Sequence, residues 1–343
     1  MDSMKIHQLK IKGFKSIGEI TLDSPKPFSV FVGANGAGKS NIFEALEFFN
    51  FCDTMDPREA AKDFGGTRDL LNQIVFPNSI EYEIDLGEIK PQLILTPVIE
   101  PMSMHFDYKY NNYGTFYHKI FKPTDPALND THRNEYKHLT NFTRLFVGKN
   151  TLVKRNIQDD SQIAFDASNL EKILKRIFQN ERVKDEITEI LQLLVPGFNS
   201  IEIKSEELSG TDSLLVYEKS LQKPLTKRLI SDGTYNILAI LAAIYQSDRP
   251  QFLCIEEPEN GLNPKVVKEL VNIIRNQCEE KGHYIWLNTH SQTLVSELLP
   301  EEIILVDKVN GMTQTKQVIG MNLHGLKMDE ALLTNSLGGG IPW

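Results

Sequence analysis

The residues with the clearest chemical meaning form a glycine-rich segment, Gly33–Ser40, which reads GANGAGKS. It fits the pattern G-x-x-x-x-G-K-[ST], in which backbone N–H groups turn toward phosphate oxygens and the following helix adds its positive end. Lys39 is expected to reach the β- and γ-phosphates of ATP, and the Ser40 hydroxyl to bind Mg²⁺. An ordinary glycine-rich turn is the alternative, but a buried strand (FSVFV) precedes the loop and a helical pattern follows it. The other expected nucleotide contacts are Gly33, Asn35, Gly36, Gly38 and Asn41.

Two adjacent carboxylates, Glu256 and Glu257, follow a second apolar run, Phe252–Ile255. Adjacent acids on a surface have no special meaning, but these come at the carboxyl end of an expected buried strand. Ligands of open α/β sheets bind at that end. Glu256 is therefore the candidate for holding Mg²⁺ or its water, and Glu257 for orienting and polarising the water that attacks the γ-phosphate.

Several further motifs resemble those of one family. The segment LISDGT at Leu229–Thr234 resembles the signature motif of ABC-type ATPases. The block IEEPENGLNP resembles the Walker B motif and D-loop of the SMC/RecF/OLD-like branch, and LNTHSQTL resembles its switch-histidine loop. The opening LKIKGFKSI is similar to the start of RecF- and SMC-type heads. Together they most resemble the stand-alone RecF-like ATPases of prokaryotes, from residue 5 to about 308 and least over residues 100–170.

The resemblance implies a fold and a partner. The fold is an α/β P-loop NTPase of ABC-ATPase head type: a mixed or parallel sheet with an antiparallel β lobe and an inserted helical subdomain, without a long coiled coil. Ser231 and Gly233 would contact the γ-phosphate bound by the opposite protomer, which implies a homodimer that sandwiches ATP. His290 would contact the γ-phosphate, and Asn260–Leu262 would cross the dimer interface as the D-loop. The chemistry agrees, because a Ser hydroxyl and a Gly N–H at a helix N-terminus form an anion site.

Two further candidates have ordinary alternatives. Lys15 is a candidate phosphate contact, and a solvated lysine in a turn is the other interpretation. Gln73, in LLNQIVFP, is the candidate for the metal-sensing Q-loop, and an unremarkable polar residue is the alternative. The signature reads Ser-Asp-Gly-Thr where most transporters have Ser-Gly-Gly-Gln, which points away from transport. Glu256 stands where the family usually has Asp, so direct coordination of Mg²⁺ and binding through water both stay open.

The spacing of apolar residues predicts the elements that position these groups. A hairpin opens the chain, alternating strands occupy residues 78–122, and strands alternate with helices after residue 229, which indicates a parallel sheet. We expect one ATPase head over residues 1–343, divided into 1–122 with the phosphate-binding loop, an inserted subdomain at 123–228, and 229–343 with the signature and switch histidine. The expected individual elements are the strands Lys5–Ile11, Glu19–Leu22, Phe28–Val32, Ser200–Lys204, Ser213–Tyr217, Gln251–Ile255, Tyr284–Leu287 and Ile303–Val306, and helices over Asn41–Phe51, up to Arg176, over 182–194, over Gly233–Gln246, from Pro264 and from Ser291.

Composition limits the class of protein. The 343 residues are 41% hydrophobic and 24% charged, as in a globular cytoplasmic protein, with no apolar run long enough for a membrane span and no signal-peptide pattern. Three widely spaced cysteines exclude a disulfide framework. The net charge of −9 argues against nonspecific coating of DNA but permits a local basic groove. Arg133–Arg155 holds six Lys and Arg residues interleaved with Tyr136, Phe142 and Phe146, which indicates either a contact with nucleic acid or a lobe with a solvated face.

Two functions fit these motifs. In the first, the chain is an ATPase whose dimer closes on MgATP and drives a DNA-linked process such as repair or anti-phage defence. In the second, it is a nucleotide-gated scaffold with slow turnover that holds or releases an effector protein, a nuclease or a toxin. A third possible function is that of a transporter ATPase subunit, but the signature sequence Ser-Asp-Gly-Thr argues against it. The chain after His290 is too short for a nuclease domain, and the tail Leu337–Trp343 is either a docking element or an unstructured end.

Overall fold

A computed structural model of the chain describes residues 4–75, 78–87, 89–100, 103–111, 116–117, 130–148, 160–206, 211–320 and residue 330. The tail Leu337–Trp343 lies outside the described residues. Within the described part, no helix is long and apolar enough to cross a membrane.

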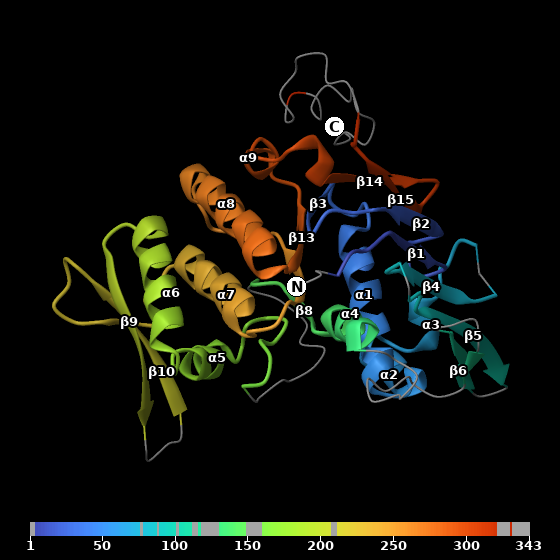
Figure 1. Cartoon of the computed structure of the whole chain (residues 1–343), viewed down its shortest axis with the longest axis horizontal. Helices are drawn as coiled ribbons and strands as arrows, with labels where there is room; N and C mark the ends of the chain where they lie inside the picture. The colour runs from blue at the N-terminus through green and yellow to red at the C-terminus, as the bar shows by residue number, and fades with distance from the viewer. Residues whose placement is uncertain are drawn as a thin grey trace.

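A six-stranded sheet forms the centre of the molecule, in the order β15-β14-β3-β13-β12-β8 (Figure 1). All neighbouring pairs are parallel except β14 and β15, which are antiparallel. The strands β3, β8, β12 and β13 are buried along their whole length, because helices or the second sheet cover both faces, and such strands read as continuous apolar runs. The strands are β3 (Phe28–Val32), β8 (Phe142–Leu145), β12 (Phe252–Glu256), β13 (Tyr284–Thr289), β14 (Ile303–Val309) and β15 (Met312–Gln317).

Two hydrophobic cores lie on the two faces of this sheet. One contains alternate strand residues such as Val30, Leu253 and Ile285 together with α5, α6, α7 and α8. The other contains the intervening residues, such as Phe31 and Trp286, together with α1 and the antiparallel lobe. The helices are α1 (Lys39–Thr54), α2 (Pro57–Asp63), α3 (Thr67–Leu70), α4 (Asp130–Thr140), α5 (Leu170–Ile177), α6 (Glu181–Leu194), α7 (Asp232–Tyr245), α8 (Pro264–Lys281), α9 (Gln292–Val295) and the 3₁₀ helix η1 (Pro300–Glu302).

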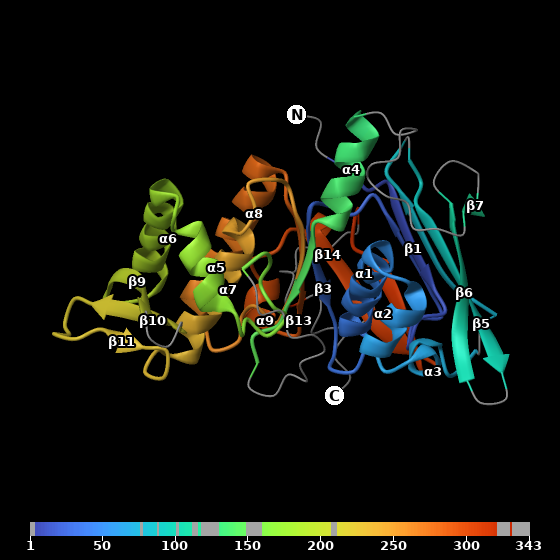
Figure 2. The same ribbon diagram turned by 90° about the horizontal axis from the view of Figure 1, so that it is seen from below.

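The antiparallel lobe is a second six-stranded sheet in the order β2-β1-β4-β5-β6-β7, seen at the side of α1 in Figure 2. Buried and more exposed residues alternate along β1, β2 and β4, as expected of strands with one face on a core. The described residues thus contain the predicted N-terminal hairpin, as β1 and β2, and strands within the predicted region 78–122, of which residues 112–115 and 118–122 lie outside the described residues. The strands are β1 (Gln8–Lys12), β2 (Glu19–Asp23), β4 (Ile80–Asp85), β5 (Gln92–Glu100), β6 (Ser103–Asn111) and β7 (Phe116–Tyr117).

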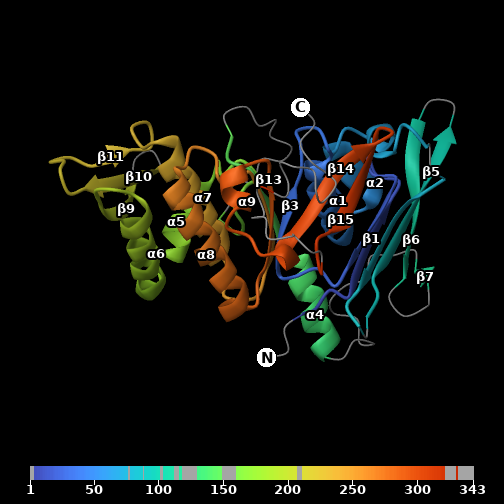
Figure 3. The same ribbon diagram turned by 90° about the horizontal axis from the view of Figure 1, so that it is seen from above.

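A small third sheet, β11-β10-β9, packs with α5 and α6 at the opposite end of the molecule (Figure 3). Its strands are β9 (Phe198–Glu206), β10 (Thr211–Glu218) and β11 (Leu225–Thr226). In the described chain between β8 and α7 the longest helix is α6, with 14 residues, so no long coiled coil is inserted there. This agrees with the predicted head fold.

The structure adds to the sequence prediction at three places. Residues 133–165, which the pattern left ambiguous, contain most of α4 and the strand β8; β8 pairs with β12 and so joins the central sheet, although it comes from the predicted inserted subdomain. The helix predicted from Ser291 is only the four-residue α9, capped by the Ser291 hydroxyl. The strand β15 was not predicted, because the polar residues of MTQTKQ lack a buried-strand pattern.

Candidate functional site

The loop Gly33–Ser40 connects β3 to α1 and has the backbone shape that its glycines permit. Gly38 precedes the helix in a left-handed conformation, with φ 102°, which costs a residue with a side chain about 1–2 kcal/mol. A Cβ atom on Gly33 would lie 2.1 Å from the carbonyl oxygen of Val306 in β14, so only glycine fits against this neighbouring strand. The Lys39 ammonium donates hydrogen bonds to the carbonyl oxygens of Gly33 (2.7 Å) and Ala34 (3.0 Å) and therefore lies inside the loop.

Side chains from distant parts of the chain form hydrogen bonds with the loop and with the start of α1. The Thr313 hydroxyl of β15 donates to the carbonyl oxygen of Ala37 at 2.9 Å and lies 2.6 Å from the Ser16 hydroxyl. Asn41 donates its amide N–H to the same Ser16 oxygen at 2.6 Å. Sequence reasoning did not identify Thr313, because contacts between residues 297 and 276 positions apart leave no local pattern, and it did not identify Ser16. The assignment of Asn41 to the nucleotide stays a prediction.

Carboxylates surround the buried Lys39. The pKa of Lys39 is lowered from its ordinary value because burial penalises the charged ammonium, and the carboxylates of Glu257, Glu259 and Glu256 offset part of this effect. Added negative charge, such as the phosphates of a nucleotide, would favour the charged ammonium further. Glu259 was not a predicted site residue; its own pKa is raised by burial, and its carboxylate accepts a hydrogen bond from Thr289.

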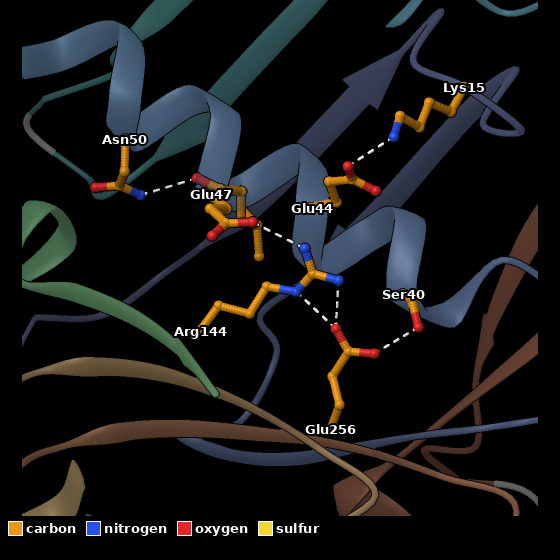
Figure 4. Close-up of polar contacts among 8 residues, drawn as sticks. Lys15, Ser40, Glu44, Glu47, Asn50, Arg144 and Glu256 are labelled. Carbon is orange, nitrogen blue, oxygen red and sulfur yellow. Dashed lines mark hydrogen bonds and ion pairs between the residues drawn. The ribbon is translucent and has the colours of Figure 1, made fainter. Parts of the chain in front are cut away.

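Ser40 and Glu256, the two residues predicted to hold Mg²⁺, lie in direct contact (Figure 4). The Ser40 hydroxyl donates to Glu256 Oε2 at 2.5 Å. A hydroxyl and a carboxylate oxygen beside a phosphate-binding loop are the hard oxygen ligands that Mg²⁺ prefers, with the remaining positions left to phosphates and water. In the described part of the chain, no group of three or more His, Cys, Asp or Glu residues is placed to hold a metal ion.

Arg144 of β8 binds the other oxygen of Glu256, and sequence reasoning did not identify it as a site residue. Its Nε donates to Glu256 Oε1 at 2.6 Å, its Nη2 pairs with the same oxygen, and its Nη1 donates to Glu47 Oε2 at 2.8 Å. Burial alone would lower the pKa of Arg144, but the carboxylates of Glu256 and Glu47 outweigh it, so this pKa lies above its ordinary value. An arginine inside the apolar strand FTRL was the available signal, since a charge that is buried needs a partner.

Gln73 and Lys15 have other partners in the structure. The Gln73 amide donates to the carbonyl oxygens of Arg68 and Leu71, and none of its hydrogen bonds goes to Ser40 or Glu256. Lys15 forms an ion pair with Glu44 of α1 at 2.6 Å, so it is not the freely solvated lysine of the alternative interpretation (Figure 4). The structure thus does not join Gln73 to the two metal candidates.

Glu257 and His290 meet at the carboxyl ends of β12 and β13. His290 Nδ1 lies 3.4 Å from Glu257 Oε1, and Asn260 donates to Glu257 Oε2 at 3.0 Å. The Glu257 N–H donates to two oxygens of Asn288, the backbone carbonyl oxygen at 3.0 Å and the side-chain Oδ1 at 3.2 Å. Glu257 has φ 46°, and a non-glycine residue in this region is characteristic of functional sites. A partly exposed carboxylate held by an amide and an imidazole can accept a hydrogen bond from water and polarise it.

Ser231 and Gly233 lie at the N-terminus of α7. The Ser231 hydroxyl caps the helix by accepting from the Thr234 N–H at 3.1 Å, and its side chain makes no hydrogen bond to Gly33–Ser40. A Cβ atom on Gly233 would lie 2.4 Å from the carbonyl oxygen of Gly261, so the predicted signature and D-loop are packed backbone to backbone. The Asn236 amide donates to the carbonyl oxygens of Pro258 and Asn260, both at 3.0 Å, and ties the two segments together.

The aromatic residues of the basic stretch Arg133–Arg155 are not arranged for stacking on bases. Tyr136 and Phe142 are 3% and 7% exposed, and the Tyr136 hydroxyl donates to Asp53. The Phe146 ring packs against Phe165. In the described part of this stretch, the aromatic side chains therefore belong to the protein interior and its packing.

The parallel sheet, the phosphate-binding loop and the carboxylates at the strand ends define a P-loop ATPase with the head fold of ABC-type ATPases. A family model described as "AAA ATPase domain" matches residues 4–191, and one described as "AAA domain, putative AbiEii toxin, Type IV TA system" matches residues 121–296. The chain belongs to this family of AAA ATPase domains, and it is an ATP-hydrolysing enzyme.

Relatives of this chain agree with that assignment. An "ATP/GTP phosphatase" of Helicobacter pylori is 21% identical over 340 residues, which cover 87% of this chain and 88% of the relative. A putative ABC transporter ATP-binding protein of Pyrococcus horikoshii is 30% identical over 102 residues, 29% of this chain and 38% of the relative. The chromosome partition protein Smc of Methanocaldococcus jannaschii is 46% identical over 43 residues, 12% of this chain and 4% of the relative.

Solved SMC heads share the fold. An Smc head bound to the C-winged helix domain of ScpA has a TM-score of 0.59 and 18% identity, and the alignment covers 91% of this chain and 96% of the head. The Smc head with an extended coiled coil, bound to the C-terminal domain of ScpA from Pyrococcus furiosus, has a TM-score of 0.56 and 18% identity, with 97% and 98% covered.

Proposed function

We propose that this ATPase binds MgATP between the loop Gly33–Ser40 and the end of β12, and hydrolyses it in a dimer that sandwiches two nucleotides. The observation that carries the proposal is the contact of Ser40 Oγ with Glu256 Oε2, beside the Lys39 ammonium. Three groups suited to the β- and γ-phosphates and their cation thus lie together at the carboxyl ends of parallel strands, where ligands of such sheets bind.

Each residue has a distinct role in this proposal. Lys39 and the loop N–H groups hold the phosphates, and Ser40 and Glu256 hold Mg²⁺, which would neutralise phosphate charge as the bond to the leaving ADP breaks. Glu257 accepts a hydrogen bond from the attacking water and draws its proton away from the oxygen that approaches the γ-phosphorus. His290, 3.4 Å from Glu257, holds that carboxylate and is placed to sense the γ-phosphate.

The position of Ser231 supports the proposed dimer. Ser231 and Asp232 are exposed at the N-terminus of α7, a 14-residue helix, which is the helix end that attracts anions, and the Ser231 side chain makes no hydrogen bond to the loop of its own protomer. A symmetric dimer would bring this end to the γ-phosphate held by the other protomer, so that each site is built from two chains.

Two substitutions test the site. Lys39→Ala should abolish ATP binding, whereas Glu257→Gln should keep binding, lose multiple-turnover hydrolysis and accumulate an ATP-dependent dimer, because the water loses its proton acceptor. Equilibrium binding, phosphate release and size-exclusion chromatography with light scattering measure the three properties. Normal turnover by Glu257→Gln would refute its role, and a monomer in saturating MgATP would refute the sandwich.

A nucleotide-gated scaffold is the second candidate, with an effector protein held or released by the dimer. The related Smc heads were solved with domains of ScpA bound, which supports a partner-binding role for this type of head. Affinity purification of the Glu257→Gln protein from its native cells separates the candidates. Recovery of a nuclease or toxin in the presence of DNase supports the scaffold, and DNA-stimulated hydrolysis by the wild type supports a DNA-linked process such as repair or anti-phage defence.

A further inference from the structure

Arg144, Glu256 and Glu47 form a buried charged cluster at the nucleotide site, in which one guanidinium lies between two carboxylates (Figure 4). Their side chains are 5%, 7% and 13% exposed, respectively. Removing such charges from water is costly, and the cost is offset only when the geometry is favourable. A cluster of this kind beside a phosphate-binding loop therefore calls for a functional explanation.

The two oxygens of Glu256 have different partners. Oε1 accepts a hydrogen bond from Arg144 Nε and forms an ion pair with Nη2 of the same side chain. Oε2 accepts a hydrogen bond from the Ser40 hydroxyl. A guanidinium is a rigid, planar donor, so it fixes the carboxylate it binds more firmly than an ammonium does. The ring of Phe165 lies 4.7 Å from Arg144 Cζ and Glu47 holds Nη1, which together restrict movement of the guanidinium.

We propose that Arg144 is a positioning residue that leaves Glu256 a single metal-facing oxygen, Oε2, and thereby makes the site select Mg²⁺ over Ca²⁺. The inference rests on the proposed MgATP site. Ca²⁺ takes six to eight oxygen ligands and accepts both oxygens of one carboxylate, whereas Mg²⁺ requires six ligands in a compact octahedron and binds carboxylates through few contacts. Because Arg144 occupies Oε1, Glu256 cannot offer both oxygens to the larger ion.

The same contact accounts for a glutamate at this position. The side chain of Glu256 has one methylene group and one rotatable bond more than the usual Asp, so its carboxylate would otherwise sample more positions. The paired hydrogen bonds from Arg144 remove this freedom and hold Oε2 beside Ser40.

The test measures metal selectivity directly. The complex of the protein with a non-hydrolysable ATP analogue and Mn²⁺ is titrated with Mg²⁺ and, separately, with Ca²⁺, and the bound Mn²⁺ is followed by electron paramagnetic resonance. The variant is Arg144→Met combined with Glu47→Gln, which removes one positive and one negative charge together and leaves no unpaired partner at position 47. Glu47→Gln alone is the matched control, because it keeps the contact of Arg144 with Glu256. Thermal unfolding checks that each variant is folded.

In the wild type and in the control, a lower concentration of Mg²⁺ than of Ca²⁺ should be enough to displace Mn²⁺. In the double variant this preference should shrink by about tenfold or more, as for the loss of a residue that orients a metal ligand. Arg144→Lys keeps the positive charge but loses the planar guanidinium with its two parallel donors, so its preference for Mg²⁺ over Ca²⁺ should lie between those of the wild type and the double variant. An unchanged ratio in a folded double variant would overturn the role of Arg144. If Glu256→Gln leaves the Mn²⁺ affinity unchanged, the proposed metal site itself is wrong.

Discussion

At the scale of single residues, the shape of the phosphate-binding loop rests on Gly38. A Cβ atom there would lie 1.9 Å from Thr313 Oγ1 and 2.7 Å from Ser16 Oγ. Gly36 has a similar positive φ, 78° against 102°, but a Cβ atom on it would meet no atom within 4 Å. The two glycines therefore share the backbone requirement and differ in the space around them.

We expect Gly38→Ala to destabilise the nucleotide-free protein by about 1–3 kcal/mol more than Gly36→Ala, because only the former adds overpacking to the left-handed backbone. Urea unfolding of both variants without nucleotide gives the difference. Equal losses would mean that Thr313 and Ser16 move aside without cost. The Thr313→Ser variant keeps the hydroxyl and should retain wild-type stability to within about 1 kcal/mol.

Residues differ in how far the sequence predicts them. Lys39 and Ser40 belong to one contiguous pattern, and Glu256 and Glu257 follow one apolar run, so local reasoning was enough to propose all four as site residues. Arg144 is 112 positions from Glu256 and 97 from Glu47; the pairing of β8 with β12 brings it to Glu256, and the packing of α1 against β8 brings it to Glu47. A lone arginine in an apolar strand indicated a buried partner without identifying it.

At the scale of elements, the starts of β12 and β13 meet α4 through two buried histidines. His283 Nδ1 accepts from the Gln251 N–H at 3.1 Å, and His138 Nε2 lies 3.3 Å from the Gln251 carbonyl oxygen. Burial lowers the pKa of each histidine to about 4. Both are therefore neutral at pH 7, and protonation of His283 at Nδ1 would place a second donor against the Gln251 N–H.

The protein should lose stability as the pH falls from about 6.5, where these histidines titrate in the unfolded chain, toward 4. The unfolded state binds more protons over this range, and each histidine contributes at most about 1.4 kcal/mol per pH unit. His283→Asn keeps an acceptor for the Gln251 N–H and cannot titrate, so its curve of unfolding free energy against pH should be flatter than that of the wild type. Parallel curves for the two proteins would contradict the prediction.

The run of apolar residues within an element decides whether the sequence predicts it. The strands β3, β12 and β13 and the helix α7 each contain a continuous apolar run, so their patterns are strong. The strands β8 (FTRL) and β15 (MTQTKQ) lie at the two edges of the central sheet and contain polar residues, and α9 has only four residues. Such elements are stabilised by tertiary contacts, which leave a weak local pattern.

At the scale of the whole molecule, the decisive question is whether each nucleotide site is built from two chains. In the proposed sandwich, a protomer contributes Lys39 and Glu257 to one site and Ser231 to the other. Lys39→Ala and Ser231→Arg proteins should each be inactive alone, the first because it cannot hold ATP and the second because a bulky cation replaces the hydroxyl at the end of α7. A mixed dimer of the two contains one site with every residue intact.

Mixing the two inactive proteins in equal amounts should therefore restore ATPase activity, to about a quarter of the wild-type level where all chains pair at random, since half of the dimers are then mixed and each has one of two sites intact. The matched control mixes Lys39→Ala with Glu257→Gln. Both of these substitutions affect the same half-site, so no combination yields an intact site and the mixture should stay inactive. Activity in the first mixture and none in the second is the pattern that only a shared site produces. If neither mixture gains activity while each protein still forms dimers with the wild type, Ser231 does not act across the interface.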